Sequence, residues 1–440
     1  MFRFSRLVAV VALGAIFALA CGGNATPTTG TSTFKGTKKV GISVPLTGQS
    51  NLYGHAKSQA LRLAADDINA KGGVNGYKIE MDILDDGTTV AKAVDNTNQL
   101  ILQDQVVAMI GDVTSAQCVA QSPIVKQNKI VYIDPTCNSY QLTLEPDLLN
   151  PYWVSIVPNT FMEGTSAAAE AAKLGAKKIF VVSPNYIFGT SETNAFVAAL
   201  TKKNPSVTYN DKSTWYVPFP TNPRWDSTIN AIQAFKPELV YSNIFSQDQV
   251  NFVKQALAVD PAFFTKYPMV TLSSIDDFNA LGALYPQGMH VYMRAPFFQL
   301  SNSKLDAWVS EYKGKYNEYP SDWALMDTDA LNLWAGAANR AGSFDADKVM
   351  PQILGKSFAS LRGYSFTVRA KDHQANVGET IGTTADSAGK YPFVTLKDAT
   401  NLKGDDIMMN PTLMQEMLDG KCETGGDPKT ANFALCPSWK

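Results

Sequence analysis

The residue types that most often carry out catalysis are sparse in this chain and are not spaced for it. The three histidines, His55, His290 and His373, lie far apart, and none belongs to an HExxH or similar metal-binding spacing. No GxSxG, GxxxxGK[ST] or GxGxxG motif occurs. We therefore expect no catalytic residues, no bound metal and no nucleotide cofactor.

Paired carboxylates are the remaining pattern that could support hydrolysis. Asp-Asp pairs occur at 66–67, 85–86 and 276–277. Adjacent acids on a helix commonly form a solvated face, whereas a glycosidase needs two carboxyl groups from different segments on either side of the scissile bond. A secreted hydrolase is therefore a remote alternative.

Short polar side chains gather in three loops, each of which follows an expected strand. The loops are 45–54 (PLTGQSNLYG), 111–118 (GDVTSAQC) and 134–140 (DPTCNSY). In the second loop Thr114 or Ser115 can cap the next helix, whose free N–H groups can bind a carboxylate or another anion. Any one of these loops taken alone is best interpreted as an ordinary helix cap. Three such loops together favour a site for a small polar ligand at one edge of a sheet.

Alternating strand and helix patterns provide the elements that position these loops. Buried strands are predicted at 39–46, 77–84, 106–111 and 129–134, and helices at 54–70, about 90–103 and about 115–126. The alternation starts again with strands at 178–183 and 238–244, helices at 189–202 and 246–258, a strand at 288–295, a helix at 322–341 and a strand at 363–369. Residues 210–225 predict an irregular surface loop. The fold class is thus α/β, with two Rossmann-like lobes built on parallel sheets.

The N-terminus has the features of an export signal. Arg3 and Arg6 precede an uncharged apolar run at 7–20, and residues 18–21 (ALAC) are similar to a bacterial lipobox. We expect residues 1–20 to be a lipoprotein signal peptide, Cys21 to be lipidated, and residues 21–36 to form a flexible tether. Plain signal cleavage is the alternative. No later run approaches 18 consecutive apolar residues.

Composition excludes further classes of protein. The 440 residues suit two or three domains, and Lys plus Arg (38) nearly balance Asp plus Glu (40) without a basic block. Nucleic acid is therefore not an expected partner. Four cysteines remain besides Cys21, and an even number in an exported protein favours disulfides over buried thiols. We expect a bridge between Cys422 and Cys436, which would close a short loop. A bridge between Cys118 and Cys137 is the further possibility, and it depends on a geometry that the sequence does not show.

Several segments, taken in order, resemble one protein family. They are GISVPLTGQSNLYG, AADDINAKGGVNGYKIEMDILDD, VVAMIGDVTSA, IVYIDPTCNSYQLT, YIFG (186–189), DALNLWAGAANRAGSFD (329–345) and RAKDHQ (369–374). Together they resemble the leucine/isoleucine/valine-type (type I) solute-binding proteins of bacterial ABC importers. The resemblance covers nearly all of residues 38 to about 398.

The resemblance implies two lobes joined by a hinge that the chain crosses three times, near 153–157, 290–296 and 365–378. The first lobe would contain 37–155 and 292–366, the second 156–291 and 367–400, and residues 401–440 would be a C-terminal extension with a cysteine pair. A solute would be held between the lobes as they close. The expected partners are a membrane permease and a lipid anchor, and we expect a monomer without cofactors, located outside the cytoplasm.

The resemblance also implies a set of ligand-binding residues. Hydroxyls and backbone amides of the first lobe would hold a carboxylate, and an aromatic residue of the first loop would close over the ligand. The matching positions in the two lobes are Tyr53, Ser115, Ala116, Thr136, Asn138, Phe188 and Phe245.

Two positions depart from the family pattern. Ser273 stands where amino-acid-binding members have a Glu that pairs with the ligand ammonium, so Asp276 or Asp277 would have to take that role. Otherwise the ligand is not an α-amino acid, since a buried ammonium without a counter-charge is costly. The family disulfide positions hold Thr88 and Thr114, and Cys118 with Cys137 are candidates to replace it. An apolar or branched-chain amino acid is the first expectation, and a non-amino-acid carboxylate or amide is the alternative.

Overall fold

The computed structural model describes residues 34–220, 224–300, 302–423 and 432–439. The expected signal peptide, Cys21 and the tether up to residue 33 lie outside these residues. Within the described ranges, no helix is long and apolar enough to cross a membrane.

Five parallel strands form the first sheet, in the order β2-β1-β3-β4-β5. Its strands are β1 (Thr37–Val44), β2 (Lys78–Asp85), β3 (Ala108–Ile110), β4 (Val131–Asp134) and β5 (Trp153–Ser155). The buried strands are continuous apolar runs because helices cover both faces. The covering helices are α1 (Asn51–Ala70), α12 (Asp322–Ala341), α2 (Val90–Asn98) and α3 (Ser115–Asn128). We call this sheet and these helices the first lobe.

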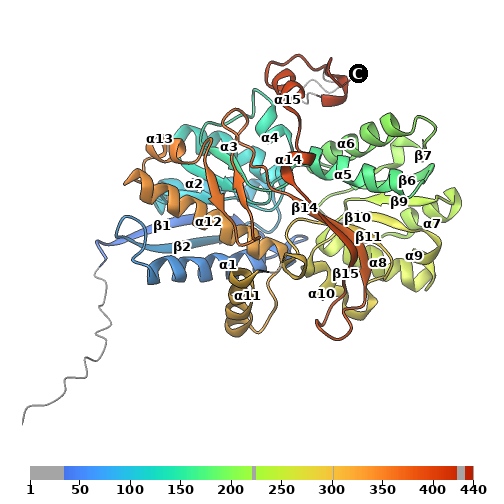
Figure 1. Cartoon of the computed structure of the whole chain (residues 1–440), viewed down its shortest axis with the longest axis horizontal. Helices are drawn as coiled ribbons and strands as arrows, with labels where there is room; N and C mark the ends of the chain where they lie inside the picture. The colour runs from blue at the N-terminus through green and yellow to red at the C-terminus, as the bar shows by residue number, and fades with distance from the viewer. Residues whose placement is uncertain (1–33, 221–223, 301, 424–431, 440) are drawn as a thin grey trace, which may run out of the picture. The chain divides into compact units, whose positions relative to one another are not determined.

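Eight strands form the second sheet, in the order β15-β14-β11-β10-β9-β6-β7, with β8 paired to β6. Its strands are β6 (Lys178–Pro184), β7 (Thr208–Tyr209), β8 (Tyr216–Val217), β9 (Leu239–Ser242), β10 (Met269–Leu272), β11 (His290–Met293), β14 (Glu379–Ala385) and β15 (Thr395–Leu402). Only β14 and β15 run antiparallel to their neighbours. In Figure 1, α5 (Thr160–Lys173) and α6 (Ile187–Lys203) lie on one side of this sheet, and α8 (Ser246–Val259) and α10 (Ile275–Leu281) lie on the other. We call this sheet and these helices the second lobe.

The remaining elements are short or peripheral. The helices are α4 (Gln141–Leu144), α7 (Asp226–Phe235), α9 (Phe263–Lys266), α11 (Ser303–Tyr316), α13 (Ala346–Val349), α14 (Gly404–Ile407) and α15 (Pro411–Leu418). A π-helical segment, η1 (Gln99–Gln103), follows α2, and 3-10 turns are η2 (Lys212–Thr214), η3 (Gly282–Leu284), η4 (Phe297–Gln299), η5 (Met350–Gln352) and η6 (Phe433–Leu435). Strands β12 (Ser357–Ala359) and β13 (Ser365–Thr367) form a separate hairpin.

The chain passes between the two sheets three times, after β5, after β11 and after β13. Two of these segments lie side by side, because Ser155 forms a bridge with Gln374. The side chain of Gln374 also donates to the carbonyl oxygen of Val157 at 2.8 Å. The residue limits expected for the lobes and for the hinge remain predictions.

The helix expected at 322–341 is confirmed as α12, and the other main elements lie within a few residues of their predicted places. Three differences stand out. The expected helix at 90–103 ends as a π-helical segment, the expected loop at 210–225 contains the 3-10 turn η2 and the short strand β8, and the chain beyond 400 forms α14, α15 and η6. Tertiary packing accounts for the ordered structure within 210–225, because Trp215 is buried against the second lobe.

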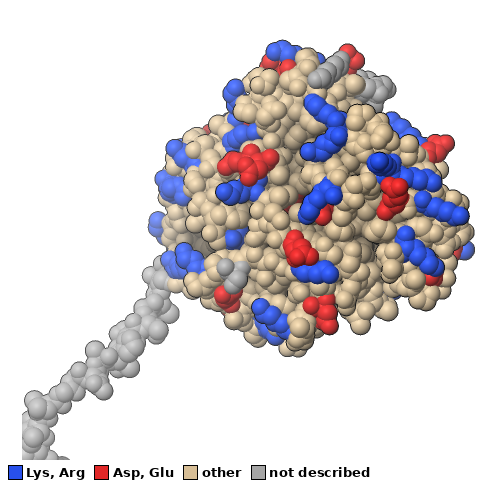
Figure 2. All heavy atoms as spheres, turned by 45° about the vertical axis from the view of Figure 1, so that its right-hand side comes forward, with Lys and Arg blue, Asp and Glu red and all other residues tan. Residues whose placement is uncertain are grey.

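Charges of both signs are interspersed on the face shown in Figure 2, which carries no continuous basic stripe. This face therefore lacks the clustered Lys and Arg that nucleic-acid binding requires.

Candidate ligand-binding site

Two loops of the first lobe meet at the carboxyl ends of β3 and β4 and line one cavity. Ser115 begins α3 shortly after β3, and Thr136 and Asn138 lie in the loop after β4. Because β3 and β4 are adjacent parallel strands, their carboxyl ends share one edge of the sheet. In this closed arrangement the cavity has a volume of about 10 Å³, which is room for about one water molecule.

Tyr53 of α1 closes the cavity toward the second lobe. Its buried ring stacks on Trp323 of α12, with the ring centroids 4.3 Å apart. Its hydroxyl accepts a hydrogen bond from the backbone N–H of Ser246 at 3.1 Å and donates to the Asp277 carboxylate at 2.9 Å. Both partners belong to the second lobe, so the structure is a closed conformation in which the two lobes touch.

Aromatic side chains of the second lobe form the apolar wall of the cavity. Phe188 at the start of α6 and Phe245 before α8 lie with ring centroids 5.6 Å apart and perpendicular planes. Tyr186 and Leu272 also line the cavity. Phe245 approaches Tyr53 at 5.9 Å, so the aromatic residues of the two lobes meet over the ligand space.

Two glycines allow the helices that carry the aromatic residues to begin close to the preceding strands. A Cβ atom on Gly189 would lie 2.0 Å from the carbonyl oxygen of Pro184, and one on Gly54 would lie 2.0 Å from that of Pro45. Each glycine directly follows an aromatic residue of the cavity. In each lobe, a glycine therefore allows the helix that carries the aromatic ring to begin close to the preceding strand.

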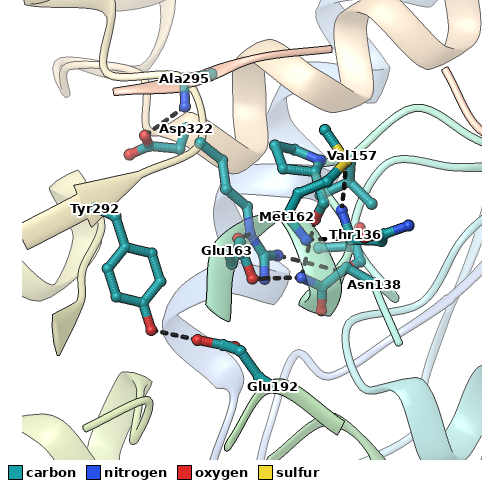
Figure 3. Close-up of polar contacts among 12 residues, drawn as sticks. Thr136, Asn138, Val157, Met162, Glu163, Glu192, Tyr292, Ala295 and Asp322 are labelled. Carbon is teal, nitrogen blue, oxygen red and sulfur yellow. Dashed lines mark hydrogen bonds and ion pairs between the residues drawn. The ribbon is translucent and has the colours of Figure 1, made fainter. Parts of the chain in front are cut away.

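Arg294, directly after β11, brings a buried positive charge to the cavity. Its side chain is 4% exposed, and its Nε and Nη2 donate to the two oxygens of Glu163 at 2.6 and 3.1 Å. Nη1 donates to the carbonyl oxygen of Thr136 at 3.2 Å, and the guanidinium lies 4.8 Å from the ring centroid of Trp323. Figure 3 shows Asn138 pointing toward the same Glu163 carboxylate, to which its side-chain amide donates.

A second buried cation lies beneath the first-lobe loops. The amino group of Lys57 in α1 donates to Oγ1 of Thr136 at 2.5 Å and to Asp327 at 2.8 Å, and both charged side chains are fully buried. Since the Thr136 oxygen accepts from Lys57, its hydroxyl hydrogen can donate to a ligand. Burial raises the pKa of Asp327 to about 6, against the lowering effect of Lys57.

Two more carboxyl groups are buried close to Arg294. Glu192 accepts hydrogen bonds from Tyr241 and from Tyr292, and Figure 3 shows the latter contact. Neither oxygen of Glu379 has a hydrogen-bond partner among the described residues, and Glu379 shares a small void with Arg294. Burial, followed by the nearby Glu163 charge, raises the pKa of Glu192 well above its ordinary value and that of Glu379 to about 8.

A disulfide joins the two ligand loops of the first lobe. Cys118 in α3 is bonded to Cys137, which lies between Thr136 and Asn138, and the Cα atoms are 6.3 Å apart. With Asp134, these cysteines form a candidate group of metal ligands within the described ranges, but their sulfur atoms are joined and offer no thiolate. The structure also joins Cys422 to Cys436 in the C-terminal segment.

Six of the predicted ligand residues line this cavity, and three do not. Tyr53, Ser115, Thr136, Asn138, Phe188 and Phe245 are the six.

The other three predicted residues, Ala116, Ser273 and Asp276, lie outside the cavity. Ser273 bonds instead to Tyr285 and Gln249, because successive side chains along an extended strand end point to opposite sides and Leu272 faces the cavity. Asp276 lies on the other side of α10, in a groove against α1 and α11. Ala116 is partly exposed beside Ser115.

Thr114, expected as a helix cap, and Asp277, expected as a partner of a ligand ammonium, make other contacts in the structure. Thr114 occupies the N-cap of α3, but its hydroxyl bonds the side chain of Gln117 rather than a backbone N–H of the helix. Asp277 is engaged by Tyr53 and by the N-cap Ser274. Neither Asp276 nor Asp277 therefore lies in the cavity as a partner for a ligand ammonium.

Sequence reasoning missed several residues that form the cavity. They are Val113, Tyr186, Leu272, Arg294 and Trp323. A signal existed for Arg294, because it is a charged residue that directly follows the buried residues Val291–Met293 of β11. No pattern indicated Trp323, because it belongs to a helix that enters the first lobe far along the chain.

Comparison with known proteins identifies the family. A model of the periplasmic binding protein family matches residues 37–390. An amino acid binding protein of Pseudomonas aeruginosa is 29% identical over 356 residues, which cover 80% of this chain and 91% of that protein. The Leu/Ile/Val-binding protein BraC3 of Rhizobium johnstonii is 25% identical over 207 residues, which cover only 46% of this chain and 53% of that protein.

A solved structure has the same fold. It is a solute-binding protein of an ABC transporter from R. palustris in complex with benzoate, with a TM-score of 0.72 and 21% identity. The match covers 83% of this chain and 97% of that one. On the family match and the two-lobed fold, the chain belongs to the periplasmic binding protein family, as a type I solute-binding protein of ABC importers.

Proposed function

We propose that this protein binds a small organic carboxylate with an apolar body and delivers it to an ABC permease. The observation that carries the proposal is the composition of the interlobe cavity. The Arg294 guanidinium and the hydroxyls of Ser115 and Thr136 meet aromatic walls there. Asn138 lines the same space, but its amide donates to Pro158 and Glu163. Polar hydrogen donors beside a buried cation are suited to a carboxylate.

The cavity offers little to an ammonium group. No Asp or Glu is among its described lining residues, and the carboxylate of Glu163 already accepts hydrogen bonds from Arg294 and Asn138. A zwitterionic α-amino acid would therefore bury its ammonium without a carboxylate partner, which is costly. The benzoate bound by the R. palustris relative has a carboxylate and an apolar ring but no ammonium, which supports an acid of this type.

An apolar amino acid is the second candidate, because a relative is named a Leu/Ile/Val-binding protein. In that case the ammonium would have to lie against the aromatic rings of the cavity, where cation–π attraction is available. The two candidates differ only in whether the ligand carries an amino group, so one experiment can separate them.

A thermal-shift panel tests the proposal. The purified protein would be tested with benzoate, 4-hydroxybenzoate, L-leucine, L-isoleucine, L-valine and acetamide. A ligand at a hundred times its Kd stabilises a folded protein by about 2.7 kcal/mol, which raises Tm by several degrees. We expect a rise with an aromatic or aliphatic acid and little with the amino acids. A rise confined to the amino acids would contradict the first candidate and support the second.

A paired substitution tests the role of Arg294. Arg294→Gln with Glu163→Gln removes both charges of the buried pair, so that neither is left uncompensated. We expect affinity for the best acid to fall at least about 100-fold, measured by calorimetry, because a charge-assisted bond to the carboxylate is lost.

The matched control is Arg362→Gln with Asp329→Asn. These residues form another buried pair of an arginine and a carboxylate, and they do not line the cavity. This control should leave the affinity within about twofold of wild type. If the two double variants bind the acid equally well, Arg294 does not hold the ligand.

We also propose that the protein lies outside the cytoplasm and is anchored to the membrane by a lipid. An extracytoplasmic position accords with the family, and the lipobox-like residues 18–21 suggest that Cys21 carries the lipid. A Cys21→Ser variant should then be released from the membrane fraction into the soluble exported fraction. Retention of that variant in the membrane would overturn the proposed anchor.

A further inference from the structure

The C-terminal segment lies outside the region that matches the family model, which ends at residue 390. After β15 it forms α14, α15 and η6, and the Cys422–Cys436 disulfide joins its two described parts. We call residues 404–423 and 432–439 the strap. Met417 and Phe433 of the strap are 0% exposed, and Leu413 is 1% exposed. Side chains buried to this degree are typical of a packed core rather than of a free tail.

Both lobes contribute to the apolar cluster that buries the strap. The first lobe supplies Tyr140 and Leu144, which follow β4, and the second supplies Phe161, Met162 and Ala195 from α5 and α6. The Phe433 ring lies 5.8 Å from that of Tyr140 and 4.9 Å from that of Phe161, with nearly perpendicular planes in both pairs. Edge-to-face pairs of this kind are favourable. One strap ring therefore contacts an aromatic residue of each lobe.

Other strap contacts fix it to the second lobe and to the third interlobe crossing. The amino group of Lys202 in α6 donates to the carbonyl oxygen of Trp439 at 2.6 Å and lies 4.6 Å from its ring centroid. Arg369, between β13 and β14, donates to the carbonyl oxygen of Met409 at 2.8 Å. These contacts hold the strap to the second lobe and to the crossing. Its contacts in the first lobe are the Tyr140 ring and α4, which packs against α15.

Tyr140 belongs to the same loop as the ligand residues Thr136 and Asn138. Its backbone N–H donates to Oγ1 of Thr160 at 3.0 Å, and the Thr160 N–H donates to the carbonyl oxygen of Asn138 at 2.8 Å. The strap thus covers the place where the ligand loop of the first lobe meets the start of α5. Rotation of the lobes about the hinge would move Tyr140 relative to Phe433.

We propose that the strap acts as an interlobe clamp, in which Phe433, held by the Cys422–Cys436 bridge, joins Tyr140 to Phe161 and favours the closed conformation. The proposal depends on lobe closure and not on the identity of the solute. A contact present in the closed state and lost on opening shifts the equilibrium toward closure. The clamp would retain the solute longer and would lower the population of open protein.

Hydrogen exchange of the ligand-free full chain tests this inference, read out by mass spectrometry. The reporters are the amides of Ser246 and Gln247, which bond Tyr53 Oη and the Gln49 carbonyl oxygen across the lobes at a place that the strap does not touch. The reference is the amide of Gly111, which bonds the carbonyl oxygen of Ile133 inside the first lobe. Opening exposes the reporters and leaves the reference protected.

Phe433→Ala is expected to accelerate exchange at the reporters about tenfold, because two aromatic contacts are lost from the closed state. The double variant Cys422→Ser with Cys436→Ser should do the same without leaving a cavity. The matched control is Lys202→Ala, which removes the second-lobe amino group that contacts the carbonyl oxygen and the ring of Trp439. This control should leave the reporters unchanged.

The outcomes separate a clamp from a passive tail. Unchanged reporter exchange in both Phe433→Ala and the serine pair would overturn the clamp, and so would equal acceleration in Lys202→Ala. If Phe433→Ala also accelerates Gly111, that variant has lost its fold and the serine pair decides. Because no solute is present, failure here leaves the proposed carboxylate specificity untouched, and failure of the ligand panel leaves the clamp untouched.

Discussion

Burial decides which of the carboxyl groups around Arg294 carry a negative charge. Three carboxyl groups, Glu163, Glu192 and Glu379, surround one guanidinium, and all are removed from water. A single Arg can neutralise only one of them, so the other two are most stable as neutral acids. Glu163 is the one held by two hydrogen bonds from Arg294, and Glu192 and Glu379 have raised pKa values.

At this scale we predict that the free energy of unfolding falls as pH rises from about 5 to about 8. Burial raises the pKa of Glu379 from 4.5 to about 8, so the folded protein keeps a proton that the unfolded chain has released. Its stabilising contribution is fully present below the unfolded pKa and is lost as pH rises through the folded value. Asp134 and Asp277, each with a pKa raised to about 7 by burial, act in the same direction.

Urea denaturation at several pH values measures this dependence, and Glu379→Gln is the informative variant. Glutamine keeps the neutral shape and does not titrate, so the fall in stability with pH should be shallower than in wild type. An identical slope in the two proteins would show that Glu379 does not retain its proton.

At the scale of elements, the ligand loops are held by covalent and backbone contacts rather than by the ligand. Cys137 is bonded to Cys118 in α3, and the N–H groups of Thr136 and Cys137 donate to Asp134 at 2.9 and 2.8 Å. The N–H of Ser139 donates to Oγ of Ser115 at 3.1 Å, which ties the second loop to the start of α3. The polar groups of the first lobe are therefore positioned before a solute arrives.

We predict that Cys118→Ala with Cys137→Ala lowers the free energy of unfolding by about 2–4 kcal/mol, because the bridge restricts the unfolded chain. The loss should be measured by urea denaturation at one pH. Adding a reducing agent to wild type also opens Cys422–Cys436, so the alanine pair isolates the first bridge. A change of less than about 0.5 kcal/mol would mean that the bridge adds little to the folded state.

At the scale of the whole molecule, closure depends on polar contacts between α1 and its preceding loop in the first lobe and the start of α8 in the second. The side chain of Gln49 donates to the carbonyl oxygen of Phe245 at 3.0 Å, and the Ser246 hydroxyl donates to the Gln49 carbonyl at 3.0 Å. Tyr53 adds the two hydrogen bonds of its hydroxyl. These contacts exist only while the lobes touch, so they select the closed state.

We predict that Tyr53→Phe weakens solute binding about tenfold, mainly through faster dissociation, because two interlobe hydrogen bonds are lost while the ring is kept. Calorimetry and stopped-flow dissociation with the best ligand of the panel would measure the effect. Tyr152→Phe is the matched control, since its hydroxyl bonds Asp347 within the first lobe. Equal losses in both variants would attribute the effect to stability rather than to closure.

The sequence by itself determined the elements and the loops of the site. Periodicity marked α12 and the buried strands. The hydroxyl and amide residues at 111–118 and 134–140 predicted a shared polar site, because carboxyl ends of parallel strands share one edge, and three of them line the cavity. These properties are local, since they depend on residues within one strand and the turn that follows it.

Only the tertiary structure decided which side chains face the cavity and what meets across the lobes. Whether Leu272 or Ser273 points inward depends on the direction of one strand end. Arg294 meets Glu163, 131 residues earlier, only because the chain crosses between the sheets and returns. The strap residues had no visible partner in the sequence, because both lobes together build the surface that buries Phe433. Such contacts depend on how distant segments pack, which no local pattern encodes.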